Sequence, residues 1–583
     1  MKLDMMLVHA PSVYDFRKRD DVLFAYLSNS DSVHISPIFE MPPVGIFAIK
    51  QHLQKCRFSV EFFNVASHML RHPEFDVEAF FQNVTADYIG IDLHWQVHAH
   101  GALELCKLYK QIHPGAKTVL GGIASTFFHQ ELIEYPQVDY VVRGYDTLLP
   151  IEQLVRAGNA PDALAEVPNL SWTHAGTTRH NAMTHVPRVF TAAVDWRQVM
   201  SGDRKAMTPY NLVIPQAGCE YNCRWCGGSR YFFSKYMGLD RGPARVQKSP
   251  EALKLELRSI AEATPGGHTV TMIDFWHEYP ALFDAGTDVF VDAKIGCVHF
   301  SLHRLPSVEK GRRMAAPVNA VIELSPDSHD LEVAKASGRG TYTMQEMEDF
   351  IDALLDNVYA FEIYFMLGLP KQTRASIMET VQYCEHLLKK YQGRRVTPFV
   401  CPMLPFLDAG SEIYDNAEKW GYTIFYRTLE EHRQALLSTN WRDRLNYETN
   451  WLTRQELVDA SYDAVRALAQ LKHAYGMLPK AITNRIVSLI DSTRVLLAEI
   501  DGHRAMPDSE EKDLKGAELR TRIRDYNRSQ FGMIRSQQRP VDLGFSRQQW
   551  FDTEEAFAAV ARGDESRTDG GPMRLDAAGC QDM

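Results

Sequence analysis

Long apolar runs are missing from this chain of 583 residues. No window reaches the roughly 18 consecutive apolar residues that a membrane-spanning helix needs. The first residues, MKLDMMLVHAPSVYDF, carry charges among the apolar positions and lack a small-residue cleavage site, so we do not expect them to be a secretory signal. We therefore expect a soluble protein of the cytoplasm with no membrane partner.

The chain also lacks a strong excess of one charge. Its 63 basic and 74 acidic residues give a formal net charge of -11, which is small for this length. The basic residues are dispersed, with no run that is typical of a phosphate-binding stripe. Nucleic acid is not an expected partner, and we expect a monomer.

The chain also lacks the even number of cysteines that a complete disulfide framework would use, because it has nine. Six of them are scattered: Cys56, Cys106, Cys297, Cys384, Cys401 and Cys580. This pattern argues against a disulfide framework and for a reducing compartment.

The first 157 residues alternate short apolar runs with amphipathic stretches, which predicts a doubly wound, Rossmann-like α/β domain. The expected strands are 2–10, 58–66, 87–94, 116–122 and 138–144, with helices at 42–56 and 101–114. In a flavodoxin-like strand order, the loops after the first and third strands would line a ligand crevice.

A second α/β unit is expected at 209–410, after a linker with a hairpin at 158–208. Its strand candidates are 211–216, 269–275, 288–296, 319–325, 360–368 and 394–403. Helical periodicity lies between them, and Ser249 and Pro250 mark one helix start. Six such units predict a partial (β/α)6 barrel of the TIM type, with chemistry at the carboxyl ends of the strands.

Helical periods dominate the region from 411 to 562. Thr453 and Glu456 form a capping box that opens a helix to about Tyr475, and Gly476 is placed to end it. A second helix is expected at 481–500. The final residues, 563–583, are rich in Gly, Asp and Ala and are expected to be disordered.

Three cysteines gather in AGCEYNCRWCGGSR, where Cys219, Cys223 and Cys226 have the spacing C-x3-C-x2-C just after the first barrel strand. A structural zinc site needs a fourth ligand, and no Cys or His follows at finger-like spacing. An iron-sulfur cluster held by three thiolates keeps one iron open to a small molecule. The loop therefore predicts a 4Fe-4S cluster at the mouth of the barrel.

This loop resembles the cysteine motif of the radical S-adenosylmethionine superfamily, including the aromatic Trp225 before the last cysteine. The resemblance implies that S-adenosylmethionine chelates the open iron and is cleaved to a deoxyadenosyl radical. VIELSPDSHDLEVAKASGRG and IYFMLGLPKQT resemble the fourth-strand and fifth-strand segments of that superfamily. By this resemblance, the S-adenosylmethionine site comprises Trp225, Gly227, Glu323, Ser325, Leu367 and Gly368. Gly227 and Gly228 would let backbone approach the ligand closely.

The N-terminal region resembles the cobalamin-binding domain of cobalamin-dependent radical S-adenosylmethionine enzymes. The segments MPPVGIFAIKQHLQK, ADYIGIDLHWQVHAHGALELCKLYKQIHPGAKTVLGG and VDYVVRGYDT carry this resemblance over most of residues 40–150. It implies a cobalamin site made from Pro11, Ser12, His94, Trp95, Gln96, Gly121, Gly122, Arg143 and Gly144. A bland alternative for the glycines is that they only make tight turns.

The cobalt ligand of conventional cobalamin domains is absent from its usual place. Their D-x-H-x-x-G motif follows the first strand, where this chain reads HAPSVYDFRKRD. Asp92 and His94 share the D-x-H part after the third strand, but Val97 stands where glycine should be. By resemblance, His94, Trp95 or Gln96 could fill the lower face of the corrin, and His94 could equally be a packed cleft residue.

The sequence gives few indications of which residues would contact a substrate. The superfamily often carries Gly-Gly-Glu after the second strand, and this chain has IDFWHEYP there, so Asp274 is either the substitute or a turn residue. WRDRLNYETNW offers Tyr447 and Glu448, which suit a pocket over a substrate or packing on the barrel. Cys401 is expected to be a small buried hydrophobe.

The resemblance implies a cobalamin-dependent radical S-adenosylmethionine methyltransferase, with methyl transfer to an unactivated carbon or a phosphinate phosphorus of a small molecule or peptide. A flavodoxin or ferredoxin type protein would supply electrons. An alternative keeps both cofactors for ring contraction, cyclisation or oxidation. A methylthiotransferase would need three N-terminal cysteines, and only Cys56 and Cys106 precede the barrel. A cobalamin sensor or an electron carrier is the non-enzymatic alternative.

Overall fold

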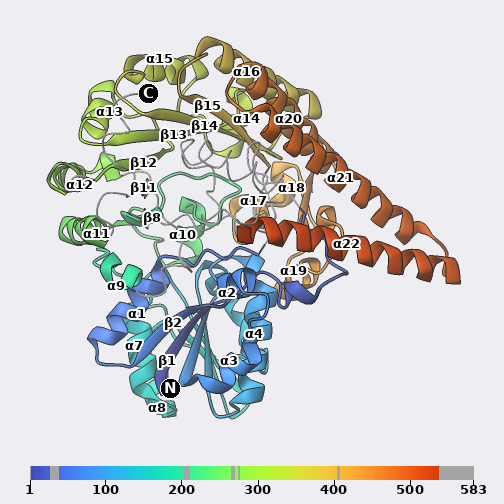
Figure 1. Ribbon diagram of the computed structural model, residues 1–583. Coiled ribbons are helices and arrows are strands. Elements are labelled where there is room, and N and C mark those ends of the chain that lie inside the picture. The colour runs from blue at the N-terminus through green and yellow to red at the C-terminus, as the bar shows by residue number, and fades with distance from the viewer. Residues whose placement is uncertain are drawn as a thin grey trace.

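The computed structural model describes residues 2–25, 38–201, 210–263, 269–273, 276–293, 295–402 and 407–536. They form an N-terminal α/β unit, a second α/β unit around a separate sheet, and a C-terminal set of helices (Figure 1). The expected tail at 563–583 lies outside the described residues.

The N-terminal sheet has seven strands in the order β2-β1-β3-β4-β5-β6-β7. They are β1 (Lys2–His9), β2 (Val60–Asn64), β3 (Thr85–Asp92), β4 (Lys117–Gly121), β5 (Tyr140–Val142), β6 (Leu170–His174) and β7 (Thr177–His180). The first five are parallel, which confirms the doubly wound expectation and its flavodoxin-like order. The order reverses between β1 and β3, so the carboxyl ends of these strands define the crevice.

Helices cover both faces of this sheet. As a result, residues 5–8 of β1 are buried consecutively rather than alternately. The helices are α1 (Gly45–Lys55), α2 (Val65–Arg71), α3 (Val77–Asn83), α4 (Ala99–Ile112), α5 (Ile123–Phe127), α6 (His129–Leu132), α7 (Leu148–Ala157) and α8 (Pro161–Ala165). Helices α1 and α7 lie on one face, and α3 and α4 lie on the other (Figure 1).

The hairpin expected at 158–208 is present as β6 and β7, and it belongs to the first sheet. Strand β6 pairs antiparallel with β5, so the sheet continues beyond the five parallel strands. The buried Arg143 guanidinium donates to the carbonyl oxygens of Asn169, Leu170 and Asn181, which fastens the hairpin.

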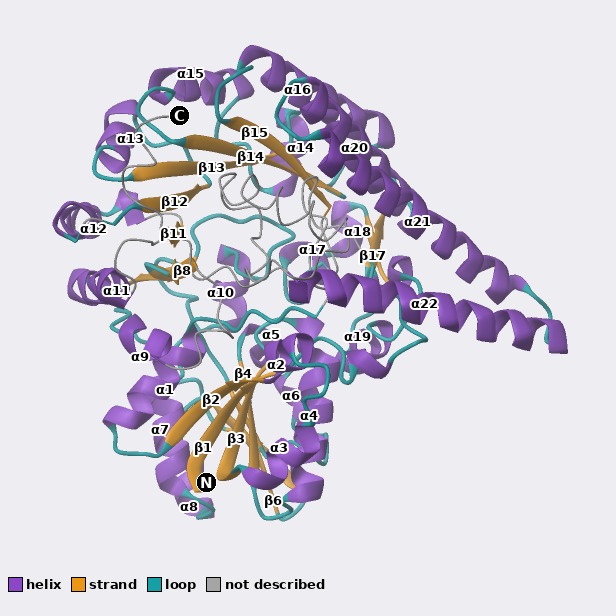
Figure 2. Cartoon of the chain, in the orientation of Figure 1, coloured by secondary structure: helices purple, strands orange, loops and turns teal. Residues whose placement is uncertain are grey.

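The second sheet has six parallel strands in the order β15-β14-β13-β12-β11-β8. They are β8 (Tyr210–Val213), β11 (Thr269–Ile273), β12 (Cys297–Leu302), β13 (Asn319–Asp327), β14 (Ala360–Leu367) and β15 (Val396–Pro402). The intervening helices are α11 (Pro250–Ala263), α12 (Pro280–Asp292), α13 (Val308–Ala315), α14 (Leu331–Ser337), α15 (Met344–Leu354) and α16 (Arg374–Lys390). This sequential order is the expected one, but β8 and β15 are edges, so the described strands form an open sheet (Figure 2).

The strand expected at 288–296 is wrong, because 288–292 end helix α12 and the third strand is β12. The β-branched and aromatic residues Val289, Phe290 and Val291 suggested a strand. The helix instead buries Phe283, Gly286 and its neighbours at helical spacing and leaves Val291 64 % exposed. The spacing of the buried positions, rather than the strand propensity of the residues, therefore indicates that this segment is a helix.

The C-terminal region is helical, as expected. It contains α17 (Glu412–Asp415), α18 (Ala417–Trp420), α19 (Leu429–Ala435), α20 (Arg454–Ala474), α21 (Lys480–Ala505), α22 (Glu510–Ser536), β16 (Tyr422–Ile424) and β17 (Tyr447–Thr449). The capping box of Thr453 and Glu456 opens α20, which packs on α16 and β15. Helices α21 and α22 project as an arm, and Phe531 of α22 packs back on Phe16, with ring centroids 5.1 Å apart (Figure 1).

Candidate active site

The three clustered cysteines lie in one loop between two short antiparallel strands. Strands β9 (Gln216–Gly218) and β10 (Arg245–Gln247) pair with each other, and the cysteine loop and helix α10 (Arg230–Tyr236) connect them. Gly218 has φ of +77°, and a Cβ there would lie 2.3 Å from the Ala244 carbonyl oxygen. The turn into Cys219 therefore requires glycine.

Backbone amides are directed at two of the three sulfurs. The N–H of Tyr221 donates to Cys219 Sγ at 3.3 Å, and the N–H of Gly228 donates to Cys226 Sγ at 3.2 Å. A Cβ at Gly228 would stand 3.5 Å from the same Cys226 sulfur. Such donors stabilise negative charge on sulfur, as in thiolate-ligated clusters.

Two of the three thiols, those of Cys223 and Cys226, have raised pKa values. Burial raises the pKa of Cys223 to about 11. Burial, together with the negative charge of Asp408 and the neighbouring cysteines, raises the pKa of Cys226. A bound metal centre would offset this cost, because it binds the thiolate form.

The cysteine loop also contacts the C-terminal end of α14 and the glycine that follows it. The N–H of Arg224 donates to the Ser337 carbonyl at 2.8 Å, and its guanidinium caps two further carbonyls at the end of α14, at 2.6 and 2.7 Å. Gly338 has φ of +93°, and a Cβ there would lie 2.0 Å from the Asn222 carbonyl oxygen. The cysteine loop thus rests directly on the backbone of Gly338.

Asp408 joins the cysteine loop to the N-terminal unit. One carboxylate oxygen accepts the Trp95 indole N–H at 2.8 Å, and the other accepts the Gly227 N–H at 2.8 Å. Burial raises the pKa of Asp408, although these two donors oppose the rise.

Neighbouring residues repeat this connection. The Gln96 side chain donates to the Leu407 carbonyl at 3.1 Å and accepts from the Ala409 N–H at 3.0 Å. The side chain of Asn446 bonds both backbone groups of Leu407, at 2.8 and 2.9 Å. The loop after β15 therefore fixes three parts of the chain together.

One face of the second sheet carries buried polar side chains. Glu323 accepts hydrogen bonds from Ser301 at 2.9 Å and Ser325 at 3.2 Å. His299 Nε2 lies 3.7 Å from Glu323 and 3.5 Å from Glu362. Burial raises the pKa of Glu323 above its usual value, although His299 and the two serine hydrogen bonds oppose the rise.

The end of β14 contacts the C-terminal region. Gly368 has φ of +94°, and a Cβ there would meet the Tyr447 hydroxyl at 2.6 Å. The Tyr422 hydroxyl donates to the Gly368 carbonyl at 2.7 Å, and Leu367 is buried. Tyr447 is 1 % exposed, so the structure gives it a packing role beside the expected adenine segment.

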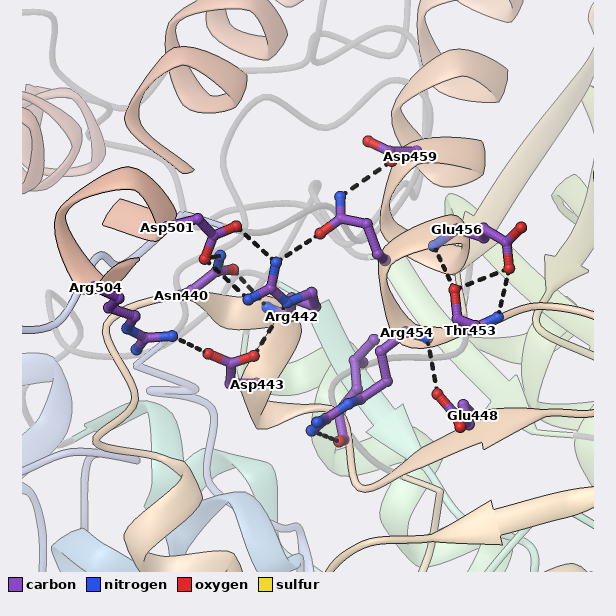
Figure 3. A network of polar contacts seen from close by, with 12 residues as sticks. Asn440, Arg442, Asp443, Glu448, Thr453, Arg454, Glu456, Asp459, Asp501 and Arg504 are labelled. Atoms are coloured by element: carbon purple, nitrogen blue, oxygen red, sulfur yellow. Dashed lines mark hydrogen bonds and ion pairs between the residues drawn. The ribbon is translucent and has the colours of Figure 1, made fainter. Parts of the chain in front are cut away.

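Glu448 lies at the start of α20. Its carboxylate accepts the Arg454 N–H at 3.4 Å, beside the capping box of Thr453 and Glu456 (Figure 3). This contact favours a helix-capping role for Glu448 over substrate contact. Asp274, the other candidate, lies outside the described residues.

The expected corrin-side glycines meet backbone. Gly122 has φ of +120°, and a Cβ there would lie 2.5 Å from the His94 Cα. At Gly121, the nearest atom to a Cβ would be the Val142 carbonyl oxygen at 3.8 Å. Gly122 is therefore required by the His94 loop, whereas a Cβ at Gly121 would make only an ordinary van der Waals contact.

The remaining corrin-side candidates are packed. The side chain of Arg143 is engaged with the hairpin, and the N–H of Gly144 donates to Thr126 Oγ1 at 3.0 Å. Pro11 and Ser12 are buried against α4, where a Cβ at Gly101 would lie 1.7 Å from the Pro11 carbonyl oxygen. These contacts favour structural roles for their side chains.

His94 is different because its side chain is 29 % exposed. Its Nδ1 lies 2.7 Å from Asp92 Oδ2, and Asp92 also bonds the buried His9 at 3.0 Å. The structure therefore brings His94, Trp95 and Gln96 together at the carboxyl end of β3, as the sequence predicted. Trp95 and Gln96 are held by the Asp408 loop.

Sequence reasoning missed several polar residues of this junction. Asp408 gives no sequence signal, because its importance comes from distant contacts. Asp327 and Arg339 form a buried ion pair of 3.6 Å near Cys223. His299 and Glu362 do have a signal, since they are charged or polar positions within otherwise apolar strands.

Comparison with known proteins bears on the N-terminal unit. The family of the B12 binding domain matches residues 33–150. This part of the chain is a B12-binding domain. Its matched region includes the carboxyl ends of β3, β4 and β5.

One curated relative extends the similarity beyond the B12-binding domain. "Uncharacterized methyltransferase PH0819" of Pyrococcus horikoshii is 27 % identical over 454 residues, which cover 73 % of this chain and 84 % of the relative.

Two solved structures of the radical S-adenosylmethionine methyltransferase TsrM from Kitasatospora setae share the fold. The structure with tryptophan substrate and aza-SAM aligns with a TM-score of 0.55 at 12 % identity, covering 85 % of this chain and 99 % of that one. The structure with cobalamin and a [4Fe-4S] cluster gives the same score and identity, covering 85 % and 100 %. The likeness shows that the B12-binding domain and the second sheet belong to one shared architecture.

The residues present fit the implied groups. Three cysteines, two amides aimed at sulfur and the adjacent Gly228 form a cradle suited to a cluster. In the B12-binding domain, the strand end at Gly121 is not crowded, and the partly exposed His94 adjoins the crevice between β1 and β3. None of the helices in the described part of the chain combines the length and apolar character needed to cross a bilayer.

Proposed function

We propose that this protein is a cobalamin-dependent radical S-adenosylmethionine methyltransferase acting on an unactivated carbon, or a phosphinate phosphorus, of a small molecule or peptide. The B12-binding domain, the three-cysteine loop and the fold shared with TsrM support this assignment. The name of the Pyrococcus relative is in line with it.

The observation that carries the proposal is the double contact of Asp408. One oxygen bonds Trp95 of the B12-binding domain, and the other bonds Gly227 of the cysteine loop. The two expected cofactor regions are therefore separated by little more than one side chain. Transfer of a group between two cofactors requires such proximity.

When bound, the cluster would supply the electron that cleaves S-adenosylmethionine, and cobalamin would carry the methyl group. Cys219, Cys223 and Cys226 would hold the cluster. Glu323 and Ser325 would orient the sugar hydroxyls of S-adenosylmethionine.

The packed segment around Gly368 would close the adenine side, because Tyr422 and Tyr447 leave no room for a side chain there. A closed site excludes water and oxygen from radical chemistry.

The test needs no knowledge of the substrate. Anaerobically purified protein is reconstituted with iron, sulfide and cobalamin, reduced, and given S-adenosylmethionine with a deuterated methyl group. We expect 5'-deoxyadenosine in solution and deuterium label in the corrin fraction.

Each outcome separates the candidate functions. Deoxyadenosine without label in the corrin fraction would overturn methyl transfer in favour of ring contraction, cyclisation or oxidation. Absence of both products would overturn the enzyme and favour a cobalamin sensor or electron carrier. We further propose that a flavodoxin or ferredoxin type donor delivers the electron and that the protein acts as a monomer, which light scattering checks.

A further inference from the structure

We propose that His52, Cys56 and Glu152 form a binding site for one zinc ion that joins helix α1 to helix α7. The site is separate from the expected cofactor regions. Cys56 follows the last residue of α1, and β2 begins at Val60, so the site lies toward the amino ends of the strands. The crevice of the B12-binding domain lies at their carboxyl ends. The inference therefore does not depend on the proposed function.

Two helices bring the three side chains together. His52 and Cys56 are four residues apart at the C-terminal end of α1, which places them on one face of that helix. Glu152 lies in the middle of α7, and α7 packs against α1. One ligating atom from each of the three residues lies within 4.8 Å of the other two.

The individual distances suit a tetrahedral zinc ion. His52 Nε2 lies 3.9 Å from Cys56 Sγ and 2.8 Å from Glu152 Oε2. Bonds of about 2.0–2.3 Å to a tetrahedral zinc place neighbouring ligand atoms about 3.4–3.6 Å apart. Rotation of the side chains by about 0.6 Å or less at the ligating atoms therefore brings all three into coordination geometry.

The sulfur distinguishes this cluster from an ordinary pair of histidine and glutamate. His72 and Glu74 form such an ordinary pair at 3.7 Å, with side chains 55 % and 77 % exposed. The side chains of His52 and Glu152 are only 29 % and 18 % exposed, and Cys56 Sγ approaches the same nitrogen. Zinc binds sulfur, imidazole nitrogen and carboxylate oxygen together, and three protein ligands leave its fourth position to water.

The end of α1 fixes the position of Cys56. The N–H of Phe58 donates to the Leu53 carbonyl at 3.1 Å, and the N–H of Arg57 donates to the Gln54 carbonyl at 2.9 Å. These are the two bonds of a Schellman motif, and Arg57 has φ of +68° where glycine is usual. The sulfur is therefore carried by a defined helix end rather than by a loose loop.

Arg156 holds the carboxylate from outside. Its Nε donates to Glu152 Oε1 at 2.9 Å, which leaves Oε2 directed at His52. Carboxylates that bind metals are commonly hydrogen-bonded in this way. Arg156 is also an electrostatic neighbour of Cys56, but its side chain is 54 % exposed. Solvent therefore leaves room for the guanidinium to move away when a metal ion adds positive charge.

The expected effect of the metal is structural. Helices α1 and α7 lie near the two ends of the region that matches the B12-binding domain, so a zinc ion would connect distant parts of its chain. Binding to the folded chain alone stabilises it by mass action. Zinc should therefore raise the Tm of the protein.

Cobalt(II) is the first probe, because its spectrum reports the ligands. The triple variant Cys219→Ala, Cys223→Ala, Cys226→Ala prevents the cysteine loop from binding the probe. We expect one cobalt ion per chain, with the visible bands of a tetrahedral site and a sulfur-to-cobalt charge-transfer band. Adding Cys56→Ser should remove that band, and adding His52→Ala should weaken zinc binding at least about tenfold. His72→Ala is the matched control and should change neither.

The outcomes are decisive in both directions. A charge-transfer band that persists in Cys56→Ser, or equal zinc affinity in His52→Ala and His72→Ala, would overturn the site. Zinc that a chelating resin removes completely would be an adventitious ion only and would overturn it as well. X-ray absorption of the otherwise unmodified chain, with its cluster assembled before zinc is added, covers a triple variant that does not fold. We expect one sulfur at about 2.3 Å from zinc, and a spectrum without sulfur would refute the assignment.

Discussion

The Trp95 indole N–H donates to the Asp408 carboxylate at 2.8 Å, although the two residues are 313 positions apart in the sequence. Asp408 is buried, and its second oxygen is occupied by Gly227. A buried carboxylate depends on its donors, because water cannot replace them. This bond therefore contributes, together with the Gln96 contacts, to the position of the B12-binding domain relative to the cysteine loop.

Trp95→Phe should destabilise the protein by about 1.5–3 kcal/mol, the usual range for a hydrogen bond to a charged group. Phenylalanine keeps an aromatic ring but is smaller than the indole, so the loss reported by the missing donor is read as the excess over the same change at a second tryptophan. Urea unfolding followed by circular dichroism measures the change. Trp451→Phe is the control, since that indole is 36 % exposed. Equal effects of the two substitutions would contradict the role of the Asp408 contact.

Gly338→Ala should prevent normal cluster assembly. The added Cβ would collide with the Asn222 carbonyl oxygen and displace the cysteine loop, at a cost of about 1–3 kcal/mol for overpacking. Iron and sulfide per chain after anaerobic reconstitution should fall well below the unmodified value. Gly393→Ala is matched in backbone, with φ of +78°, but has nothing within 4 Å of its Cβ. Equal iron content in both variants would refute the steric explanation.

Gly122→Ala should weaken cobalamin binding and leave the cluster intact. Its Cβ would force the backbone of His94 to move, which alters the crevice of the B12-binding domain. We expect at least about a tenfold rise in the Kd, since a displacement costing 1.4 kcal/mol of binding energy gives that factor. Gly158→Ala, with φ of +59° and open space, is the control within the same unit. Cobalamin titration measures both.

Acid should loosen the loop that carries Asp408. Neutral His432 accepts from Asn446 at 3.2 Å, and Asn446 holds Leu407. Burial lowers the pKa of His432 to about 4, below the unfolded value of about 6.5. Between these values the unfolded chain binds more protons, so stability falls as the pH falls.

His432→Gln should remove part of this pH dependence. From about pH 6.5 to about pH 5, the unmodified protein should lose about 2 kcal/mol more stability than the variant, at about 1.4 kcal/mol per pH unit. Urea unfolding at several pH values gives the comparison. Parallel pH profiles would show that His432 does not titrate with folding.

The sequence predicted the strands of the first sheet well, because β1 and β3 are long apolar runs between clear helical periods. It failed at 288–296, where β-branched residues occupy a helix whose buried face has a 3.6-residue period. The cysteine loop was readable because ligand spacing is local. His94 could be placed after the third strand, but its partner His9 comes from a different strand.

The role of Asp408 was not accessible from sequence. Its two donors lie 313 and 181 residues away, and no periodicity connects them. The same holds for the packing of the buried Tyr447 against Gly368, which no local motif indicates. The roles of such residues depend on contacts with distant parts of the chain, whereas motif spacing describes only residues that are close together in the sequence.

Cys223→Ala should abolish deoxyadenosine formation while cobalamin binding persists. The substitution removes one of three sulfurs, so the expected cluster loses a ligand that no neighbouring thiol replaces in the described loop. The B12-binding domain is built on a separate sheet from the one that the cysteine loop adjoins. Cys297→Ala, at the start of β12, is the control and should retain both properties. Joint loss of cobalamin and cluster in Cys223→Ala would mean that the two sites fold as one unit, and the division of labour between the sheets would have to be abandoned.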